Sequence, residues 1–251
     1  MAAGEGERRI EIRELRGLDE LNEAVRLQKE IWGFADIELL PLRLFVVAQK
    51  VGGQTLGAFD GNRMVGFLLA IPGLKQGSMY LHSHMMGVLP EYRNLRIGRR
   101  LKLKQREEAL SRGIRLIEWT FDPLELKNAF FNIERLGAIV RRYVRNQYGT
   151  TSSPLHGGLP TDRCVAEWHL DSPRVAAIVE GREPPRGPVL GRIEIPADIA
   201  EIRSANPEKA RAIQAEASDR FEEYFRLGLA VTGFENRPDA GVYLFAKWDS
   251  Q

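Results

Sequence analysis

Apolar positions along the chain switch between a period of two and a period of about 3.6, a pattern that predicts strands alternating with helices. In residues 9–16, Ile10 and Ile12 alternate with polar side chains, as in a strand with one buried face. Residues 18–32 carry an apolar stripe at helical spacing and end before Gly33. The expected strands are 9–16, 54–59, 63–71, 79–88, 114–121, 138–144 and 163–170. The expected helices between them are 18–32, 41–50, 98–112 and 124–136.

The clearest local signal is Asp60-Gly61 between two apolar runs, which is typical of a β-hairpin. Strands joined by hairpins pair antiparallel, whereas helices between strands cover the faces of a sheet. The order of elements therefore predicts an α/β (α+β) fold with a mixed, mostly antiparallel central sheet flanked by helices.

The composition changes after Asp171. Residues 180–196 hold four prolines and three glycines, so we interpret 171–196 as a linker. Beyond it, the pattern predicts a helix over 207–227 and strands over 229–234 and 241–248. The expected domains are a core at 8–170, the linker, and an extension at 197–251. The extension should pack on the core, because its apolar residues Phe221, Tyr224, Phe225 and Leu229 need an apolar partner.

A weak internal echo links the two ends of the chain. Residues 192–195 (Arg-Ile-Glu-Ile) repeat residues 9–12, and the Gly-Phe-Glu at 233–235 resembles the start of the predicted hairpin. One interpretation is that the tail is a half-copy of the first β-α-β-β unit. Chance similarity is the alternative.

The composition is that of an ordinary globular protein, with 251 residues, 43% hydrophobic and 28% charged, and a net charge of +2. One cysteine, Cys164, can form neither an intramolecular disulfide nor a thiolate zinc site. The longest apolar run, 64–71, is too short to cross a bilayer. Residues 1–7 lack the apolar core of an export signal, so a cytoplasmic location without membrane binding is expected.

Charge is concentrated in one place, because seven basic residues and no acidic residue lie between Arg93 and Arg106. A loop that turns directly into a helix exposes backbone N–H groups at the positive end of the helix dipole. Gly98 would let a phosphate approach the backbone closely. A solvated helix face is the alternative. Nucleic-acid binding is disfavoured, because no aromatic residues are interleaved for base stacking.

The loop Arg93-Asn94-Leu95-Arg96-Ile97-Gly98 resembles the acyl-CoA loop of the GNAT acyltransferases, Arg/Gln-x-x-Gly-x-Gly/Ala. The order of elements resembles that family over residues 8–170, and similarity is greatest to a bacterial branch of predicted acetyltransferases. Arg96 stands where the family usually has its first glycine. A side chain at this position is tolerable if the backbone keeps a negative φ. The stretches that carry the resemblance to this branch are Leu81–Met85, Trp119–Leu124, Leu136–Ala138 and Leu159–Arg163.

The resemblance implies a GNAT-type fold with acetyl-CoA or another acyl-CoA as co-substrate and no metal. Backbone groups of Met86 and Val88 would pair with the pantetheine arm, and Asn128 is nearest to the asparagine with which members bind it. Many members carry a tyrosine acid at the position of Ile133. The pyrophosphate would be held by the loop residues Arg93, Asn94, Leu95, Arg96, Ile97, Gly98 and Arg99.

The candidate base is His82, which lies eleven residues before Arg93, where histone-type members carry a glutamate base. A regular strand would place His82 and His84 on one face with Met86 and Val88. Both histidines have structural alternatives, and a metal site at the pair would lack an evident third ligand. Glu118 is the alternative base, or else a structural partner of the Arg141-Arg142 pair. Tyr143 and Tyr148 are candidate replacement acids.

These observations predict an acyl-CoA-dependent N-acyltransferase that acts directly on an amine of a small molecule or amino acid. The alternative is a non-catalytic acyl-CoA-binding or regulatory module. No nucleic-acid partner is expected, and a homodimer is left open.

Overall fold

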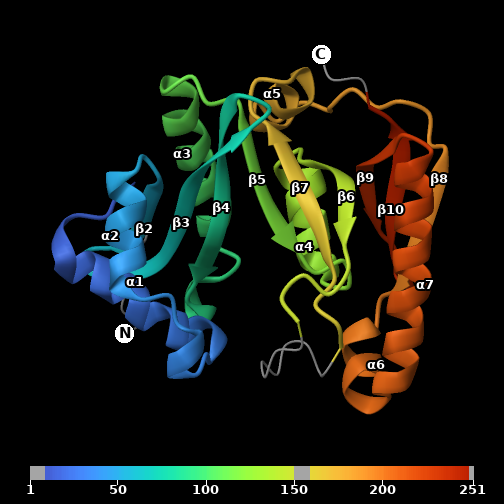
Figure 1. Ribbon diagram of the computed structural model, residues 1–251, viewed down its shortest axis with the longest axis horizontal. Coiled ribbons are helices and arrows are strands. Elements are labelled where there is room, and N and C mark those ends of the chain that lie inside the picture. The colour runs from blue at the N-terminus through green and yellow to red at the C-terminus, as the bar shows by residue number, and fades with distance from the viewer. Residues whose placement is uncertain (1–8, 150–158, 249–251) are drawn as a thin grey trace, which may run out of the picture. The chain divides into compact units, whose positions relative to one another are not determined.

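The computed structural model describes residues 9–149 and 159–248 (Figure 1). They form two compact units, of which unit 1 ends at Arg115 and unit 2 begins at Leu116. This division falls inside the segment 8–170 that was expected to form one domain. The absence of an export signal was predicted from residues that lie outside the described ranges. None of the helices in the described ranges is long and apolar enough to cross a bilayer.

Unit 1 is a four-stranded sheet with three longer helices, and its strands follow the order β1-β2-β3-β4. Each neighbouring pair is antiparallel, and the β2–β3 hairpin pairs Asp60 with Arg63 as its turn sequence predicts. Its elements are β1 (Ile10–Glu14), α1 (Gly17–Trp32), η1 (Asp36–Glu38), α2 (Leu42–Lys50), β2 (Gln54–Asp60), β3 (Arg63–Lys75), β4 (Ser78–Val88), η2 (Pro90–Tyr92) and α3 (Ile97–Ser111).

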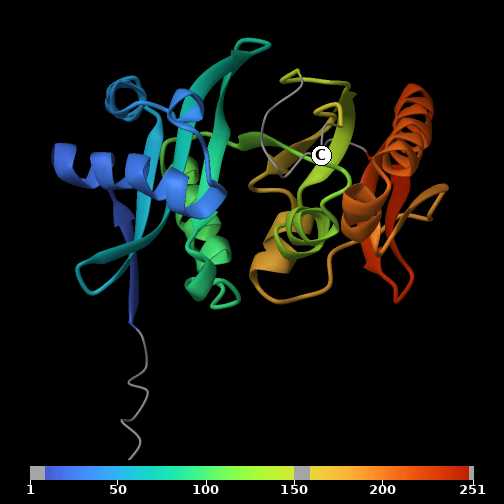
Figure 2. The same ribbon diagram turned by 90° about the horizontal axis from the view of Figure 1, so that it is seen from below.

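The helices of unit 1 cover both faces of the sheet (Figure 2). Phe67 on β3 contacts Trp32 of α1 and Phe45 of α2, with ring centroids 5.8 and 6.0 Å away. On the other face, Lys102 of α3 reaches Ser83 of β4. The buried apolar core of unit 1 therefore lies on either side of β2, β3 and β4.

Unit 2 continues with strands in the order β5-β7-β6-β9-β10-β8, and its ladders are antiparallel. The predicted mixed α/β fold with a mostly antiparallel sheet flanked by helices is confirmed. The elements of unit 2 are β5 (Leu116–Phe121), α4 (Leu126–Phe130), the π-helical turn η3 (Phe131–Arg135), β6 (Ile139–Val144), β7 (Arg163–His169), α5 (Pro173–Val179), β8 (Gly191–Pro196), α6 (Ile199–Ala205), α7 (Pro207–Arg226), β9 (Leu229–Asn236) and β10 (Ala240–Lys247).

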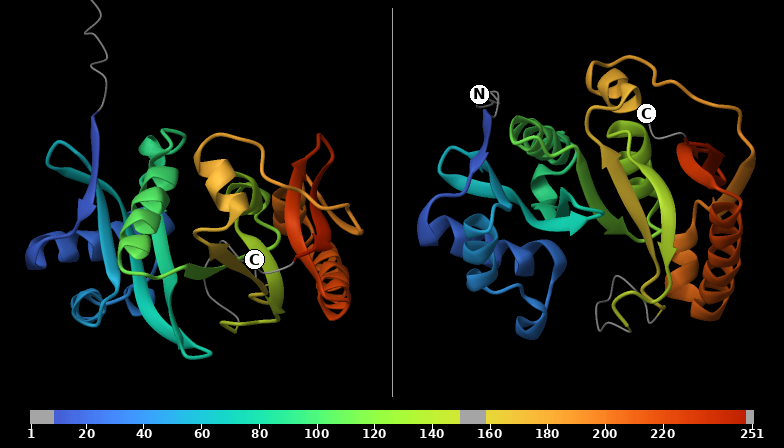
Figure 3. Two further views of the ribbon diagram at one scale, coloured as in Figure 1. Left: turned by 90° about the horizontal axis from the view of Figure 1, so that it is seen from above. Right: turned by 45° about the horizontal axis from the view of Figure 1, so that its top comes forward.

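The C-terminal helix α7 lies along the end of the unit 2 sheet (Figure 3). Its Phe221 is fully buried, stacks on Tyr143 of β6 at 5.2 Å and meets Tyr243 of β10 edge-on at 5.0 Å. Strand β9 also pairs with β6, at Val140 and Val231. The tail and the strands that precede it therefore share one apolar core.

Three expectations for the second half of the chain were wrong in detail. The segment 171–196 is more than a linker, because it contains α5 and the edge strand β8. The helix expected over 124–136 divides into α4 and the π-helical turn η3. In the tail, β8 pairs with the second strand of its hairpin, whereas β1 pairs with the first. The two β-α-β-β segments thus differ in topology, which contradicts the half-copy interpretation.

Candidate active site

The basic loop connects strand β4 to helix α3 within unit 1. Tyr92 at the end of η2 is buried, and its hydroxyl donates a hydrogen bond to Asp60 Oδ2 at 2.8 Å, which anchors the start of the loop. Residues 93–96 that follow are exposed, and α3 begins at Ile97. The loop therefore starts at the anchored residue Tyr92 and runs directly into the N-terminus of α3.

Two residues of this loop adopt the left-handed conformation, Asn94 at φ 67° and Arg96 at φ 59°. Asparagine visits this region readily, whereas an arginine there costs about 1–2 kcal/mol relative to a right-handed conformation. The condition under which a side chain at position 96 would be tolerated, a negative φ, is therefore not met. The backbone adopts the conformation that favours glycine, although Arg96 replaces the glycine of the motif.

The start of α3 suits an anionic ligand such as a pyrophosphate. The residue before the helix, Arg96, makes no side-chain capping hydrogen bond, and the first turn contains no acidic residue. The four first N–H groups of a helix have no partner within it, and they carry the positive end of the helix dipole. Half-buried Arg99 adds a positive charge in the same turn. The residues present therefore fit the phosphate part of an acyl-CoA.

Strand β4 contains a β-bulge at His84. On β3, Leu69 pairs with Met85 and Ala70 pairs with Ser83, so His84 is the extra residue. The bulge reverses the alternation of side chains along β4.

This reversal corrects the expected arrangement of the strand. Residues directly opposite each other in a sheet share a face, so the Ile71–His82 and Phe67–Gly87 pairs place His82 with Gly87 on the α1 side. A Cβ on Gly87 would indeed meet Ile31 and Trp32 of α1. Met86 lies on the opposite face, as does Val88. The prediction that His82 shares a face with Met86 and Val88 is therefore wrong.

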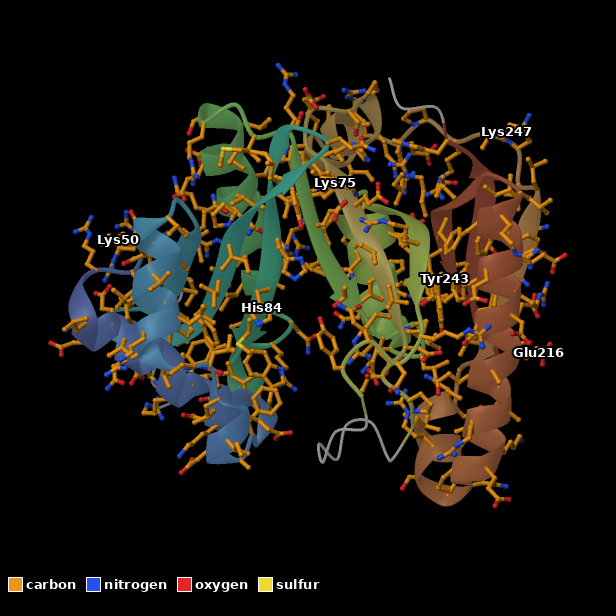
Figure 4. The ribbon with its side chains drawn as sticks, viewed as in Figure 1. Lys50, Lys75, His84, Glu216, Tyr243 and Lys247 are labelled. Atoms are coloured by element: carbon orange, nitrogen blue, oxygen red, sulfur yellow. The ribbon has the colours of Figure 1, made fainter. Side chains whose placement is uncertain are left out.

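The two histidines nevertheless lie close together, with ring centroids 5.8 Å apart. Figure 4 labels His84 on β4. His82 is half-buried, whereas His84 keeps an exposed side chain. Desolvation by the protein atoms around it lowers the pKa of His84 below its ordinary value. At neutral pH its imidazole is therefore predominantly uncharged and can accept a proton.

Unit 2 holds the other candidate base, Glu118, which is only 4% exposed on β5. Its Oε1 lies 2.7 Å from Nη2 of Arg142, and Glu118 is directly opposite Glu167 of β7. Burial alone would raise the pKa of Glu167, but His169 and Arg141 lower it to about 2. Glu118 thus belongs to a charged cluster of the five residues Glu118, Arg141, Arg142, Glu167 and His169.

The remaining candidates lie in unit 2. Asn128 is exposed on α4, and Ile133 is fully buried in the π-helical turn. Tyr143 donates to Asp162 Oδ2 at 2.9 Å and also contacts Ser218, and burial raises its pKa far above 10. Tyr148 is half exposed and lies 3.1 Å from the Thr120 hydroxyl. Burial also raises the pKa of Cys164, so its thiol is not a ready nucleophile.

Sequence reasoning missed a buried polar cluster under β4 in which Lys102 is central. Lys102 lies in the basic run between Arg93 and Arg106, yet only 2% of its surface is exposed. The signal was present in the helical spacing, because the buried face of α3 consists of Ile97, Leu101, Lys102, Gln105 and Ala109. Within the described ranges, no three His, Cys, Asp or Glu side chains are arranged to hold a metal ion.

Comparisons with known structures agree with this architecture. A ribosomal-protein-S18-alanine N-acetyltransferase from Escherichia coli is 18% identical with a TM-score of 0.52, covering 65% of this chain and 96% of its own. NAA60 from Arabidopsis thaliana, solved with acetyl-CoA, is 14% identical with a TM-score of 0.52, covering 64% and 99%. Naa20 from Chaetomium thermophilum, solved with a bisubstrate analogue, is 18% identical with a TM-score of 0.50, covering 70% and 92%. At these identities the likeness shows the fold.

The family itself comes from the sequence. No curated protein matches the chain, but residues 19–137 match the model of the Acetyltransferase (GNAT) family. The matched range contains strand β4, the basic loop and helix α3, and it continues through β5 and α4. Over residues 19–137 the chain therefore matches the Acetyltransferase (GNAT) family.

Proposed function

We propose that this protein transfers the acetyl group of acetyl-CoA directly to an amine of a small molecule or amino acid. The observation that carries the proposal is the loop at residues 93–98, whose two left-handed residues lead into the uncapped start of α3. The match of residues 19–137 to the GNAT family supports it. The sequence and the fold leave the identity of the acceptor to experiment.

Binding would be shared between backbone and side chains. The amides from Asn94 to Arg99 and the Arg93 side chain would hold the pyrophosphate, as fixed dipoles hold anions elsewhere. Backbone groups of Met86 and Val88 remain the proposed partners of the pantetheine arm. The role of Asn128 rests on the family resemblance alone. Acetyl-CoA supplies the activated acyl group when bound.

The chain must also take up a proton, because an amine attacks a thioester only in its neutral form. We propose His82 as this base, with His84 in a supporting role, and Glu118 of unit 2 as the alternative base. The uncharged imidazole of His84, 5.8 Å from the ring of His82, favours the histidine pair. The ion pair of Glu118 with Arg142 favours a structural role for this carboxylate.

The binding step can be tested at Gly98. Replacing Gly98 by leucine places a large side chain where the phosphates would approach, and the dissociation constant for acetyl-CoA should rise by about 10-fold or more. Gly98→Ala is the matched control, because the family motif accepts alanine at this position, and its affinity should change far less. Isothermal titration calorimetry measures both. Equal affinities for wild type and Gly98→Leu would contradict the assignment of the loop.

A non-catalytic acyl-CoA-binding module is the second candidate. The observation that favours it is Ile133, which is fully buried where many family members have a tyrosine acid. An assay of thiol release from acetyl-CoA over a panel of amines separates the two. Binding of acetyl-CoA without thiol release for any amine would favour the module.

A further inference from the structure

Four polar side chains are buried together between α3 and the sheet of unit 1. They are Gln54 of β2, Ser83 of β4, and Lys102 and Gln105 of α3, and none has more than 5% of its surface exposed. Lys102 Nζ donates to Ser83 Oγ at 2.8 Å and to Gln105 Oε1 at 3.0 Å. Gln54 Nε2 donates to the backbone carbonyl of Gln105 at 3.1 Å. The cluster therefore joins two strands to one helix.

Burying this cluster costs more free energy than burying apolar side chains in a protein core. A buried polar group costs free energy unless it is well hydrogen-bonded, and a buried ammonium costs more. Two of the amide atoms, Gln54 Oε1 and Gln105 Nε2, find no hydrogen-bond partner in the described part of the chain. Apolar side chains at these positions would fill the same space at lower cost. Such a cluster needs a reason beyond stability.

Its position suggests that reason. Ser83 lies between His82 and His84, immediately before the β-bulge. Lys102 lies on the second turn of α3, the helix that begins at the basic loop. The Lys102–Ser83 hydrogen bond thus connects the helix of the phosphate loop to the strand of the candidate base.

We propose that Lys102 and Ser83 form a positioning pair that fixes the β4 bulge and thereby the imidazoles of His82 and His84. The proposal rests on the proposed function for its effect on catalysis. Side chains alternate along a strand, so moving the bulge by one residue would send a neighbouring side chain to the opposite face. Anchoring Ser83 on the α3 face keeps His82 on the other face and leaves His84 as the bulged residue.

Ser83→Ala tests the pair without removing the charge of Lys102. In this variant the titration midpoint of the His84 imidazole, followed by NMR and assigned with His84→Gln, should shift. A small displacement of a catalytic group from its productive position slows a reaction strongly, so turnover should fall about 10- to 100-fold. Affinity for CoA should stay close to that of wild type, because the basic loop is untouched. Ser83→Thr restores a hydroxyl and should recover both the titration and the turnover.

The matched control is Ser111→Ala at the exposed end of the same helix, where the hydroxyl bonds only to the Glu108 carbonyl. It should leave the His84 titration and turnover unchanged. Lys102→Met removes the other half of the pair and serves if Ser83→Ala does not fold. In the double variant, turnover should fall no further than in either single variant.

A folded Ser83→Ala or Lys102→Met protein with the wild-type His84 titration would overturn the proposal. The NMR measurement needs no substrate, so it separates this inference from the proposed function. A shifted titration in a protein that acetylates no amine would support the positioning pair and contradict only the proposed activity.

Discussion

Two buried polar clusters in this protein differ in the groups that compensate for the loss of water around their charges. In unit 2, Glu118 and Glu167 are buried, while the side chains of Arg141 and Arg142 that pair with them are 37% and 44% exposed. In the unit 1 cluster, Lys102 is the one ionisable member and is buried completely. Opposite charges therefore balance in the first cluster, whereas neutral hydrogen-bond partners surround the ammonium of Lys102 in the second.

The comparison separates fixed charges from groups that can exchange protons. Arginine and histidine partners lower the pKa of Glu167 to about 2 despite its burial, so it stays ionised at any physiological pH. In unit 1, burial lowers the pKa of Lys102 well below its ordinary value and that of His84 as well. Burial in the β4 region thus favours the uncharged forms of its bases, whereas the Glu167 carboxylate of the β5–β7 region stays charged. A proton acceptor belongs with the former.

The largest effect is expected when each candidate base is substituted separately. His82→Ala should reduce turnover by about 10²–10⁴-fold, since that is the usual contribution of a general base. Glu118→Gln should reduce it much less. Steady-state kinetics with acetyl-CoA and an active amine measure both variants. A full loss in Glu118→Gln with an active His82→Ala would assign the base to unit 2 instead.

The charged cluster should also appear in acid unfolding. The pKa of Glu167 is about 2 in the folded protein, below the ordinary value of an unfolded chain. A depressed carboxyl pKa stabilises the fold above about pH 5, and this stabilisation, about 3 kcal/mol, is lost as the pH falls toward 2. Urea unfolding at pH 6 and pH 3 should show a smaller loss for Glu167→Gln than for wild type. Equal losses of unfolding free energy in the two proteins would mean that the pKa of Glu167 is not lowered in the folded state.

Removing a guanidinium partner is expected to have a smaller effect. Arg142→Met leaves the buried carboxylate of Glu118 without its 2.7 Å partner. The free energy of unfolding should fall by about 2 kcal/mol, because the Arg142 side chain is already 44% exposed to solvent. Adding Glu118→Gln removes the buried charge that faced Arg142 and should recover part of this loss in chemical denaturation. A double variant less stable than Arg142→Met would contradict the pairing.

The smallest effect is expected for Lys102. Lys102→Met removes a desolvated ammonium but leaves Ser83 and Gln105 without its hydrogen bonds, so stability at pH 7 should change by no more than about 1 kcal/mol. A lowered lysine pKa means that the unfolded chain binds the extra proton, so wild-type stability should rise with pH toward the ordinary lysine pKa. The variant should lack this rise in thermal melts between pH 7 and pH 10. The same rise in both proteins would contradict the buried position of the charge.

Local patterns predicted most of the elements, because turns and amphipathic faces are written in neighbouring residues. Asp60-Gly61 gives the β2–β3 hairpin, and the basic loop leads into α3 as predicted. The bulge at His84 could not be predicted, because it depends on how β3 pairs with β4. A regular period of two therefore assigned the wrong face to Met86.

Long-range contacts account for the other differences. The topology of the tail depends on the pairing of β8 with β10, which Arg192-Ile193-Glu194-Ile195 alone does not specify. The burial of Lys102 follows from which face of α3 meets the sheet. Residues 150–158 lie outside the described ranges. The roles of His82, His84, Glu118 and Asn128 stay predictions.

The pairing of β9 with β6 also bears on aggregation. Without the tail, β6 would be the outer strand beside β7, with the sequence Ile-Val-Arg-Arg-Tyr-Val free to recruit a strand from another molecule. The tail moves the outer position to β8, which is short, ends at Pro196 and turns Arg192 and Glu194 outward. Charge and proline are the features with which natural sheets resist edge-to-edge association. The C-terminal segment thus replaces an aggregation-prone edge strand, β6, by an edge strand, β8, that resists pairing with another molecule.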